Sequence, residues 1–300
     1  MSNGKKLKEL IARDGIVVMP GVYDAASAKM VEQAGFSAAY VTGSGLHASL
    51  MGCPDMDILT MNEIVDQTKR ICQAVNIPIF ADAEEGFGGI PNVMRTVQLL
   101  EEAGAAAMHL DDEVSPGKCP YLYPDVKQEL LSINDMCEKI EAAVAAKKDK
   151  DTLIVVRCDT RGSVYDTGGE DYIEETIKRL NAYAEAGADC LYPSTPKYED
   201  YKRICQAIDF PYKVCVVSPQ IANIPGYDLH LHTPEEWLKD TGCNIMLAPL
   251  FTITTSMKYM KEALVEFKNT GIQPKDSMIS FDEYNDVLSV SNHGLFKGLL

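Results

Sequence analysis

Short apolar runs alternate along the chain with longer amphipathic stretches. The short runs are apolar at consecutive positions, a pattern typical of parallel strands that helices cover on both faces. They span residues 16–20, 38–43, 77–82, 106–111, 152–157, 190–193, 212–217 and 244–248. Between them, apolar residues recur at helical spacing and predict helices over residues 61–75, 91–103, 132–147, 168–186, 197–208, 234–240 and 253–268.

A repeated sequence motif marks the junctions between the predicted helices and strands. Residues 101–104 (Glu-Glu-Ala-Gly) and 184–187 (Ala-Glu-Ala-Gly) each precede an apolar run, which indicates a helix end, a glycine cap and a buried strand. Eight strand–helix units predict one (β/α)8 TIM-type barrel domain over residues 1–300, with a doubly wound sheet as the alternative. Residues 275–300 carry more apolar side chains than a barrel needs, so we expect C-terminal oligomerisation helices there.

Charge and cysteine content narrow the possible partners and the compartment. The chain has 44 acidic and 28 basic residues, a net charge of −16, and no cluster of basic residues, which excludes nucleic acid and anionic membranes as partners. No apolar run approaches the roughly 20 residues that span a bilayer. The nine cysteines are irregularly spaced, and residues 1–14 are charged and amphipathic, unlike a signal peptide. We therefore expect reduced thiols and a cytoplasmic location.

Acidic side chains stand at the ends of two neighbouring predicted strands. Asp82 and Glu84 are two positions apart, a spacing that places both on one face of a strand, and Asp111 ends the next strand. The carboxyl ends of barrel strands carry the active site in this architecture. Three carboxylates around one pocket predict a Mg²⁺ or Mn²⁺ site, and solvated loop acids are the alternative interpretation.

Other candidate groups surround the same end of the predicted barrel. Arg157 ends an apolar strand, so it either pairs with the acids or receives a substrate carboxylate in bidentate geometry. The loop 42–45 (Thr-Gly-Ser-Gly) offers hydroxyl and amide donors to an anion. Lys118 lowers the pKa of a neighbouring thiol, which makes Cys119 the candidate chemical cysteine. The five histidines lack metal-ligand spacing and are interpreted as structural.

Taken in chain order, these pieces resemble the isocitrate lyase/phosphoenolpyruvate mutase superfamily over nearly the whole chain. Residues 82–88 (Asp-Ala-Glu-Glu-Gly-Phe-Gly) are similar to the metal motif of that family, and residues 111–119 are similar to its flap. Residues 156–159 (Val-Arg-Cys-Asp) resemble its Ala-Arg-Thr-Asp strand. Residues 281–285 (Phe-Asp-Glu-Tyr-Asn) resemble the helix that family members exchange between the subunits of a tetramer.

The resemblance implies a Mg²⁺-dependent lyase, with Mn²⁺ as a possible substitute. The implied reaction cleaves the C2–C3 bond of a 2-hydroxy di- or tricarboxylate, such as a substituted malate or methylisocitrate, and releases a 2-oxo acid such as pyruvate. It also implies a homotetramer with a swapped C-terminal helix. The residues implied are Asp82, Glu84, Asp111 and Asp55 for the metal, Tyr40, Thr42, Gly43, Ser44 and Arg157 for the substrate, and Cys119, Lys118, Arg157 and Tyr121 for catalysis.

Several positions depart from the family pattern. Glu84 occupies the position of a family aspartate, and Asp111 occupies the position of a family glutamate. One side chain is longer and the other shorter, so the summed length of the two is unchanged. Residues 120–121 (Pro-Tyr) replace the Gly-His of the flap, and Ser194 and Cys215 stand where a glutamate and an asparagine are expected. Two alternatives stay open. The first is another enzyme on the same scaffold: an oxaloacetate-type decarboxylase, a phosphonopyruvate hydrolase or a phosphoenolpyruvate mutase-like enzyme. The second is a non-catalytic metabolite-binding barrel.

Overall fold

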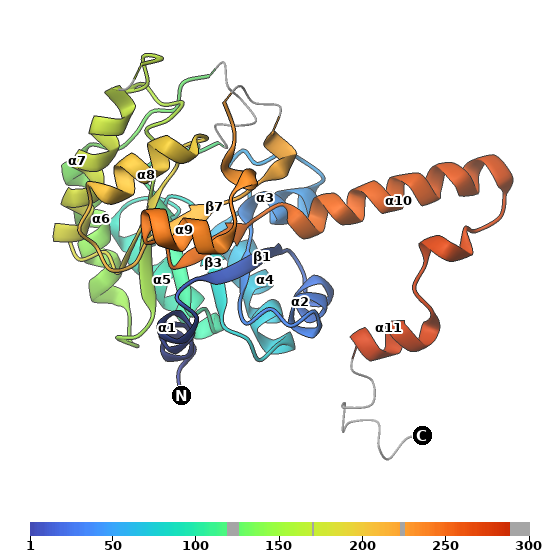
Figure 1. Cartoon of the computed structure of the whole chain (residues 1–300). Helices are drawn as coiled ribbons and strands as arrows, with labels where there is room; N and C mark the ends of the chain where they lie inside the picture. Colours follow the sequence, from blue (N-terminus) through green and yellow to red (C-terminus); the bar gives the residue numbers. More distant parts are fainter. Residues whose placement is uncertain (119–125, 170, 223–225, 289–300) are drawn as a thin grey trace.

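Eight parallel strands form a ring with helices around its outside (Figure 1). The computed structural model describes residues 1–118, 126–169, 171–222 and 226–288. Every strand overlaps a predicted apolar run, which confirms the strand prediction. The strands are β1 (Val17–Val22), β2 (Ala39–Val41), β3 (Ile79–Asp82), β4 (Ala107–Asp111), β5 (Leu153–Cys158), β6 (Cys190–Pro193), β7 (Val214–Val216) and β8 (Ile245–Ala248).

The pairing of the strands closes the ring into a barrel. β1 pairs with both β2 and β8, with Val17 opposite Ile245, so the first and last strands are neighbours. The remaining seam, between β6 and β7, is joined by one bridge from Leu191 to Lys213. Because strands adjacent in the chain are also adjacent around this nearly closed ring, the (β/α)8 prediction is confirmed and the doubly wound alternative is excluded.

Helices fill the connections, and the repeated glycines end several of them. Gly35, Gly104, Gly187 and Gly242 have φ values of 90°, 106°, 100° and 68°, the left-handed region expected of such caps. Short π or 3₁₀ turns lie at His47–Met51, Pro219–Ile221, Leu229–Leu231 and Lys275–Ser277. The helices are α1 (Asn3–Asp14), α2 (Ala25–Gln33), α3 (Gly43–Leu46), α4 (Met61–Ala74), α5 (Ile90–Ala103), α6 (Ile133–Ala146), α7 (Asp171–Glu185), α8 (Tyr198–Gln206), α9 (Pro234–Thr241), α10 (Phe251–Thr270) and α11 (Phe281–Val287).

The core forms two layers. Inside the barrel, side chains such as Phe80, Val155 and Leu247 pack together, and Leu7 and Ile11 of α1 join them. A second, larger layer lies between the strands and the surrounding helices. Because α1 packs near the amino ends of the strands, the carboxyl ends are the side of the barrel left for a cavity.

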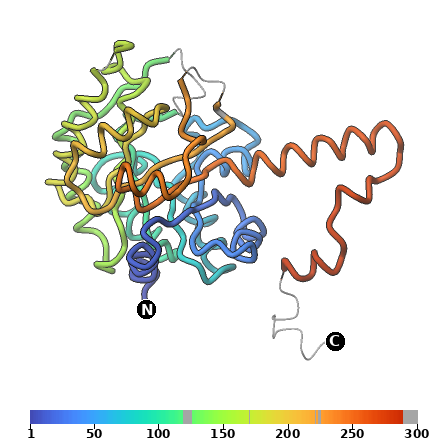
Figure 2. Tube along the Cα trace, viewed as in Figure 1, coloured from blue at the N-terminus to red at the C-terminus, as the bar shows by residue number. Residues whose placement is uncertain are grey.

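α10 leaves the barrel and extends away from it, and α11 turns back toward α2 (Figures 1 and 2). Gln33 Nε2 of α2 donates a hydrogen bond to the Asp286 carbonyl of α11 at 3.0 Å. We call residues 251–288 the arm. Many apolar side chains of the arm are exposed, among them Tyr259, Met260 and Leu264. Within the described part of the chain, no helix combines the length and the hydropathy needed to cross a membrane.

Candidate active site

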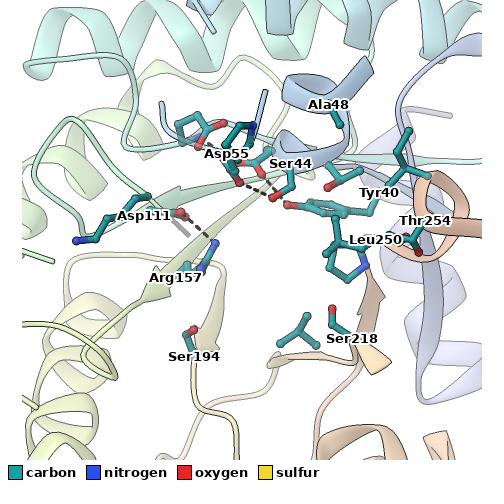
Figure 3. A pocket seen from close by; sticks show the side chains of 18 of the residues that line it. Tyr40, Ser44, Ala48, Asp55, Asp111, Arg157, Ser194, Ser218, Leu250 and Thr254 are labelled. Carbon is teal, nitrogen blue, oxygen red and sulfur yellow. Dashed lines mark hydrogen bonds and ion pairs between the residues drawn. The ribbon is translucent and has the colours of Figure 1, made fainter. Parts of the chain in front are cut away.

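A cavity of about 310 Å³ lies at the carboxyl ends of the strands (Figure 3). Cys119 and Tyr121 lie outside the described residues, so their place at this cavity stays a prediction. Gly43 borders the acidic residues of the cavity. The sequence-predicted residues that line it are Tyr40, Thr42, Ser44, Asp55, Asp82, Glu84, Asp111, Lys118 and Arg157.

Asp82 and Glu84 are brought to the cavity by a turn of the backbone at the end of β3. β3 ends at Asp82, and Glu84 has a φ of 48°, a left-handed conformation that costs a non-glycine residue on the order of 1 kcal/mol. The expectation that strand alternation aligns these side chains is therefore wrong in its reason, although both line the cavity. A Cβ on Gly43 would lie 2.6 Å from Glu84 Oε1 and 2.7 Å from Asp82 Oδ2, so a larger residue there would displace both carboxylates.

Asp82 is held by several donors at the floor of the cavity. The Tyr40 hydroxyl donates to Asp82 Oδ2 at 2.8 Å, and the Gly43 N–H donates to the same oxygen at 3.0 Å. His109 lies 3.3 Å from Asp82 Oδ1 through Nε2 and 2.7 Å from Asp111 Oδ1 through Nδ1. Burial alone lowers the pKa of His109, but the charges of Asp82 and Asp111 raise it to about 10.

His109 contacts two of the predicted metal-site acids, a position that its interpretation as a structural residue did not include. Its two ring nitrogens lie between Asp82 and Asp111, which places it behind two of the predicted metal-site acids. The available signal was its place two residues before Asp111 on one strand, which puts both side chains on the same face.

Ligand atoms of Glu84 and Asp55 lie within 4.8 Å of each other, so a cation between the two carboxylates would offset their mutual repulsion. Glu84 Oε1 is buried and has no hydrogen-bond partner within the described structure. Burial, followed by the charges of Asp82 and Asp55, raises the pKa of Glu84 well above its usual value. Burial also raises the pKa of Asp55, whose Oδ2 accepts a hydrogen bond from the Ser44 hydroxyl. Converging carboxylate oxygens with one atom left unpaired fit a hard divalent cation.

His47 lies beside these acids but is occupied by the backbone. One ligand atom each from His47, Asp55 and Glu84 lie within 4.8 Å of one another. However, the N–H groups of residues 58 and 59 donate to His47 Nε2 at 3.1 and 3.3 Å, and Nδ1 lies 2.9 Å from the Gly43 carbonyl. Both ring nitrogens are therefore used in orienting the loop, and the carboxylates remain as the groups available to a metal.

Arg157 enters the cavity from the end of β5 already paired with acids. Its Nη1 lies 3.2 Å from Asp111 Oδ2 and its Nη2 lies 2.8 Å from Asp159 Oδ1. The guanidinium also lies 5.5 Å from the centre of the Tyr192 ring. Of the two roles open from the sequence, the ion pair is therefore formed, while the side chain still lines the cavity.

A second buried network, centred on Asp112, holds Asp159, the residue that pairs with Arg157. The Asp112 carboxylate accepts hydrogen bonds from the Asp159 N–H at 2.9 Å and from the Tyr183 hydroxyl at 2.8 Å. Arg179 Nη1 lies 3.3 Å from the same carboxylate and donates to a backbone carbonyl at 2.9 Å. Burial, with the nearby charge of Asp159, raises the pKa of Asp112 to about 6. The network fixes Asp159 and, through it, Arg157.

Lys118 is the second cation at the cavity. Its backbone N–H donates to Glu113 Oε2 at 3.0 Å, and its Nζ donates to the Val126 carbonyl at 2.7 Å. The second bond joins the chain on either side of residues 119–125. The cysteines among the described residues are free thiols, as expected from their spacing.

The remaining wall is neutral or apolar. Ser194, Val216 and Ser218 line it, together with Leu250 and other residues at the start of α10 (Figure 3). Cys215 packs in a buried cluster that does not line the cavity, so the sequence match that placed it at the site is wrong. On a strand as short as β7, a shift of one residue exchanges the two faces.

Comparison with known proteins gives consistent matches over almost the whole chain. Residues 7–267 match the family model described as phosphoenolpyruvate phosphomutase. The chain is 36% identical over 301 residues to 2,3-dimethylmalate lyase of Eubacterium barkeri, covering 97% of this chain and 95% of that protein. It is 33% identical to 2-methylisocitrate lyase of Aeropyrum pernix, covering 97% and 88%.

Solved structures show the same architecture. The structure of a 2,3-dimethylmalate lyase in a trigonal crystal form superposes with a TM-score of 0.86 at 26% identity, covering 100% of this chain and 95% of that one. Oxaloacetate acetylhydrolase in complex with the inhibitor 3,3-difluorooxalacetate superposes with a TM-score of 0.85 at 28% identity, covering 99% and 97%.

Proposed function

The chain belongs to the isocitrate lyase/phosphoenolpyruvate mutase superfamily, and we propose that it is a metal-dependent carbon–carbon lyase. Its substrate is a 2-hydroxy di- or tricarboxylate, such as a substituted malate. The observation that carries this proposal is the buried Glu84 Oε1, which has no hydrogen-bond partner among the described residues, in an acidic cavity that Arg157 also lines. Acids that can hold a divalent cation, beside an arginine that can bind a carboxylate, suit a substrate with several negatively charged oxygens.

The proposed reaction is a retro-aldol cleavage. The C2–C3 bond breaks, the C2 hydroxyl loses its proton and becomes the carbonyl of a 2-oxo acid, and C3 takes up a proton to complete the second carboxylic acid. Asp55, Asp82, Glu84 and Asp111 would hold Mg²⁺, or Mn²⁺ in its place. A cation held by these residues would supply Lewis-acid stabilisation of the negative charge that develops in the reaction.

The chain's own residues bind and orient the substrate in this proposal. Arg157 receives the C1 carboxylate, with its position fixed by Asp159. Ser44 lies in the first turn of α3, where its N–H has no partner within the helix and suits an anion. The N–H of Gly43 instead donates to Asp82 in this structure, which orients a proposed metal ligand.

Cys119 is the proposed acid that protonates C3, with Tyr121 as the alternative donor. Cys119→Ser is expected to slow turnover by roughly 10²-fold, within the usual range for a lost general acid, and to leave substrate binding intact. Single-turnover kinetics and a binding titration measure the two quantities. Unchanged turnover in Cys119→Ser would move the acid to Tyr121 or to water.

The proposal is tested by release of 2-oxo acid in a coupled assay with Mg²⁺. The panel contains substituted malates, 2-methylisocitrate, oxaloacetate and phosphonopyruvate. Metal-dependent release of pyruvate or glyoxylate from a hydroxy acid supports the lyase. Release of pyruvate from oxaloacetate or phosphonopyruvate alone favours the second candidate, an oxaloacetate-type decarboxylase or a phosphonopyruvate hydrolase. If no substrate is turned over and Mg²⁺ does not change the melting temperature, the non-catalytic metabolite-binding barrel is favoured.

We also propose that the arm joins copies of this chain into a homotetramer by helix exchange. The exposed apolar side chains support this, because a surface of that kind is unfavourable in water without a partner. The exposed set on the arm includes Phe251, Tyr259, Met260, Leu264, Val265, Phe267, Ile272, Met278, Ile279, Phe281 and Tyr284.

Leu264→Asp is expected to break this assembly. The side chain is 59% exposed in the single chain, so the substitution leaves the barrel folded while placing a charge in the proposed interface. Sedimentation velocity of wild type should give four times the 33.0 kDa chain mass, and the variant should sediment as a smaller species. Leu231→Asp, at a position 68% exposed outside the arm, is the matched control. A wild-type monomer would contradict the proposal.

A further inference from the structure

Two loops that are distant in the sequence meet beside the cavity, and each contributes to its wall. Residues 52–59 precede α4 and contain Asp55, and residues 115–118 come after β4 and contain Lys118. Asp55 and Lys118 both line the cavity. Asp57 belongs to the first loop and is not among the described residues that line the cavity.

The Asp57 carboxylate joins the two loops. Its Oδ2 accepts a hydrogen bond from the Ser115 hydroxyl at 2.8 Å and a second from the Gly117 N–H at 3.0 Å. Asp57 has a φ of 55°, a left-handed conformation that is unfavourable for a residue with a side chain and is kept only where its surroundings fix it. The N–H groups of residues 58 and 59 donate to the buried His47 ring, so Asp57 projects from a fixed base.

Residues 115–118 depend on hydrogen bonds for their position, because none of their side chains is buried. Besides the two bonds to Asp57, the Lys118 N–H donates to Glu113 Oε2 at 3.0 Å, and Lys118 Nζ donates to the Val126 carbonyl at 2.7 Å. Without Asp57, the hydrogen bonds that remain to described residues would all start from Lys118.

We propose that Asp57 is a positioning residue: its two hydrogen bonds form a tether that holds residues 115–118 against the loop that carries Asp55, and turnover depends on this tether. The tether itself follows from the geometry, whereas its importance for turnover rests on the proposed lyase function.

The tether should affect the chemical step more than substrate binding. Lys118 lines the cavity, and Cys119, the proposed acid, is the next residue in the sequence. Displacement of a reacting group by about 1 Å can cost about 10²-fold in rate. Arg157, the proposed carboxylate-binding residue, is instead held by Asp111 and Asp159, which the tether does not contact.

Asp57→Gly and Asp57→Asn form a matched pair of variants. Both remove the charge of Asp57, which, after burial and the charges of other acids, raises the pKa of Glu84. Glycine and asparagine both adopt the left-handed conformation, so the melting temperature of each variant should stay within about 3 °C of wild type. The two differ in the acceptor, because asparagine keeps a side-chain oxygen for the Ser115 and Gly117 donors and glycine has none.

Hydrogen exchange of the protein alone, without metal or substrate, measures the tether. In Asp57→Gly the Gly117 amide should exchange at least about 10-fold faster than in wild type, because it has lost its acceptor. In Asp57→Asn its rate should stay within about threefold of wild type. Mass spectrometry with electron-transfer fragmentation resolves this amide from that of Lys118. Equal rates in wild type and Asp57→Gly overturn the tether.

Steady-state kinetics with Mg²⁺, and with the hydroxy acid of the panel that wild type cleaves fastest, measures the role in turnover. Asp57→Gly should lower kcat by at least about 10-fold with KM within about threefold, and Asp57→Asn should keep kcat within about threefold.

Two kinetic results overturn the positioning role. An equal loss of kcat in both variants would assign the effect to the missing charge, and an unchanged kcat in Asp57→Gly would show that turnover does not use the tether. If wild type cleaves no hydroxy acid, the lyase function fails, and hydrogen exchange alone decides whether Asp57 holds residues 115–118.

Discussion

Asp82→Asn is expected to lower kcat/KM of the proposed lyase by about 10³-fold or more. A metal ion contributes several kcal/mol of transition-state stabilisation, and each 1.36 kcal/mol corresponds to a factor of ten in rate. The amide keeps the size of the side chain but removes one negative charge from the proposed metal site. It also points an N–H₂ group at donors, because Tyr40, Gly43 and Glu84 all donate to the native carboxylate.

Metal binding provides a readout for Asp82→Asn that does not depend on turnover. Mg²⁺ should raise the melting temperature of wild type and have little effect on the variant, since binding to the folded state alone shifts the unfolding equilibrium. Circular dichroism checks that the variant is folded. Asp66→Asn, at an exposed position on α4, is the matched control. Wild-type turnover and Mg²⁺ response in Asp82→Asn would falsify the site assignment.

Arg179→Met is expected to destabilise the fold by about 3–5 kcal/mol, the usual result of removing one partner of a buried ion pair. The Arg179 side chain is 1% exposed and the Asp112 side chain is fully buried. Without the guanidinium, the Asp112 carboxylate keeps the Asp159 N–H and the Tyr183 hydroxyl but has no cation. Urea unfolding of both proteins at pH 8 measures the difference.

The pH dependence gives this prediction a definite sign. Asp112 has a folded-state pKa of about 6, above the value of about 3.9 for an unfolded chain. A raised acid pKa contributes stability at low pH that is lost as the pH rises through the folded-state pKa. Arg179→Met raises that pKa further, so the stability difference between the two proteins should be smaller at pH 5 than at pH 8. Arg95→Met, at an exposed position on α5, is the control. A loss that is equal at both pH values would show that the cost is one of packing.

The barrel itself was readable from the sequence because its signal is local and repeated. The strands are largely apolar on both faces, and several helices end at a glycine, so the pattern identifies the eight units without knowledge of their contacts. The position of the candidate acids could be predicted from the same strand pattern. Asp82 and Asp111 end parallel strands, and the ends of parallel strands converge in any barrel.

The rest depended on contacts between distant residues. Burial lowers the pKa of His109, and the charges of Asp82 and Asp111 on both sides of its ring raise it. The position of Arg157 on β5 depends on Asp112, which follows the neighbouring strand β4. The strand that places Val216 rather than Cys215 at the cavity is three residues long, too short for a sequence match to fix its register.

For this protein the sequence alone determined the barrel, the end of it that bears the acids, and the superfamily, since each is encoded by short-range patterns or by motifs in fixed order. The tertiary structure decided which acid oxygens at the cavity lack a hydrogen-bond partner, which cations line it, and which wall is apolar. Those properties come from burial and from the balance of charges across the cavity, and both are set by residues far apart in the chain.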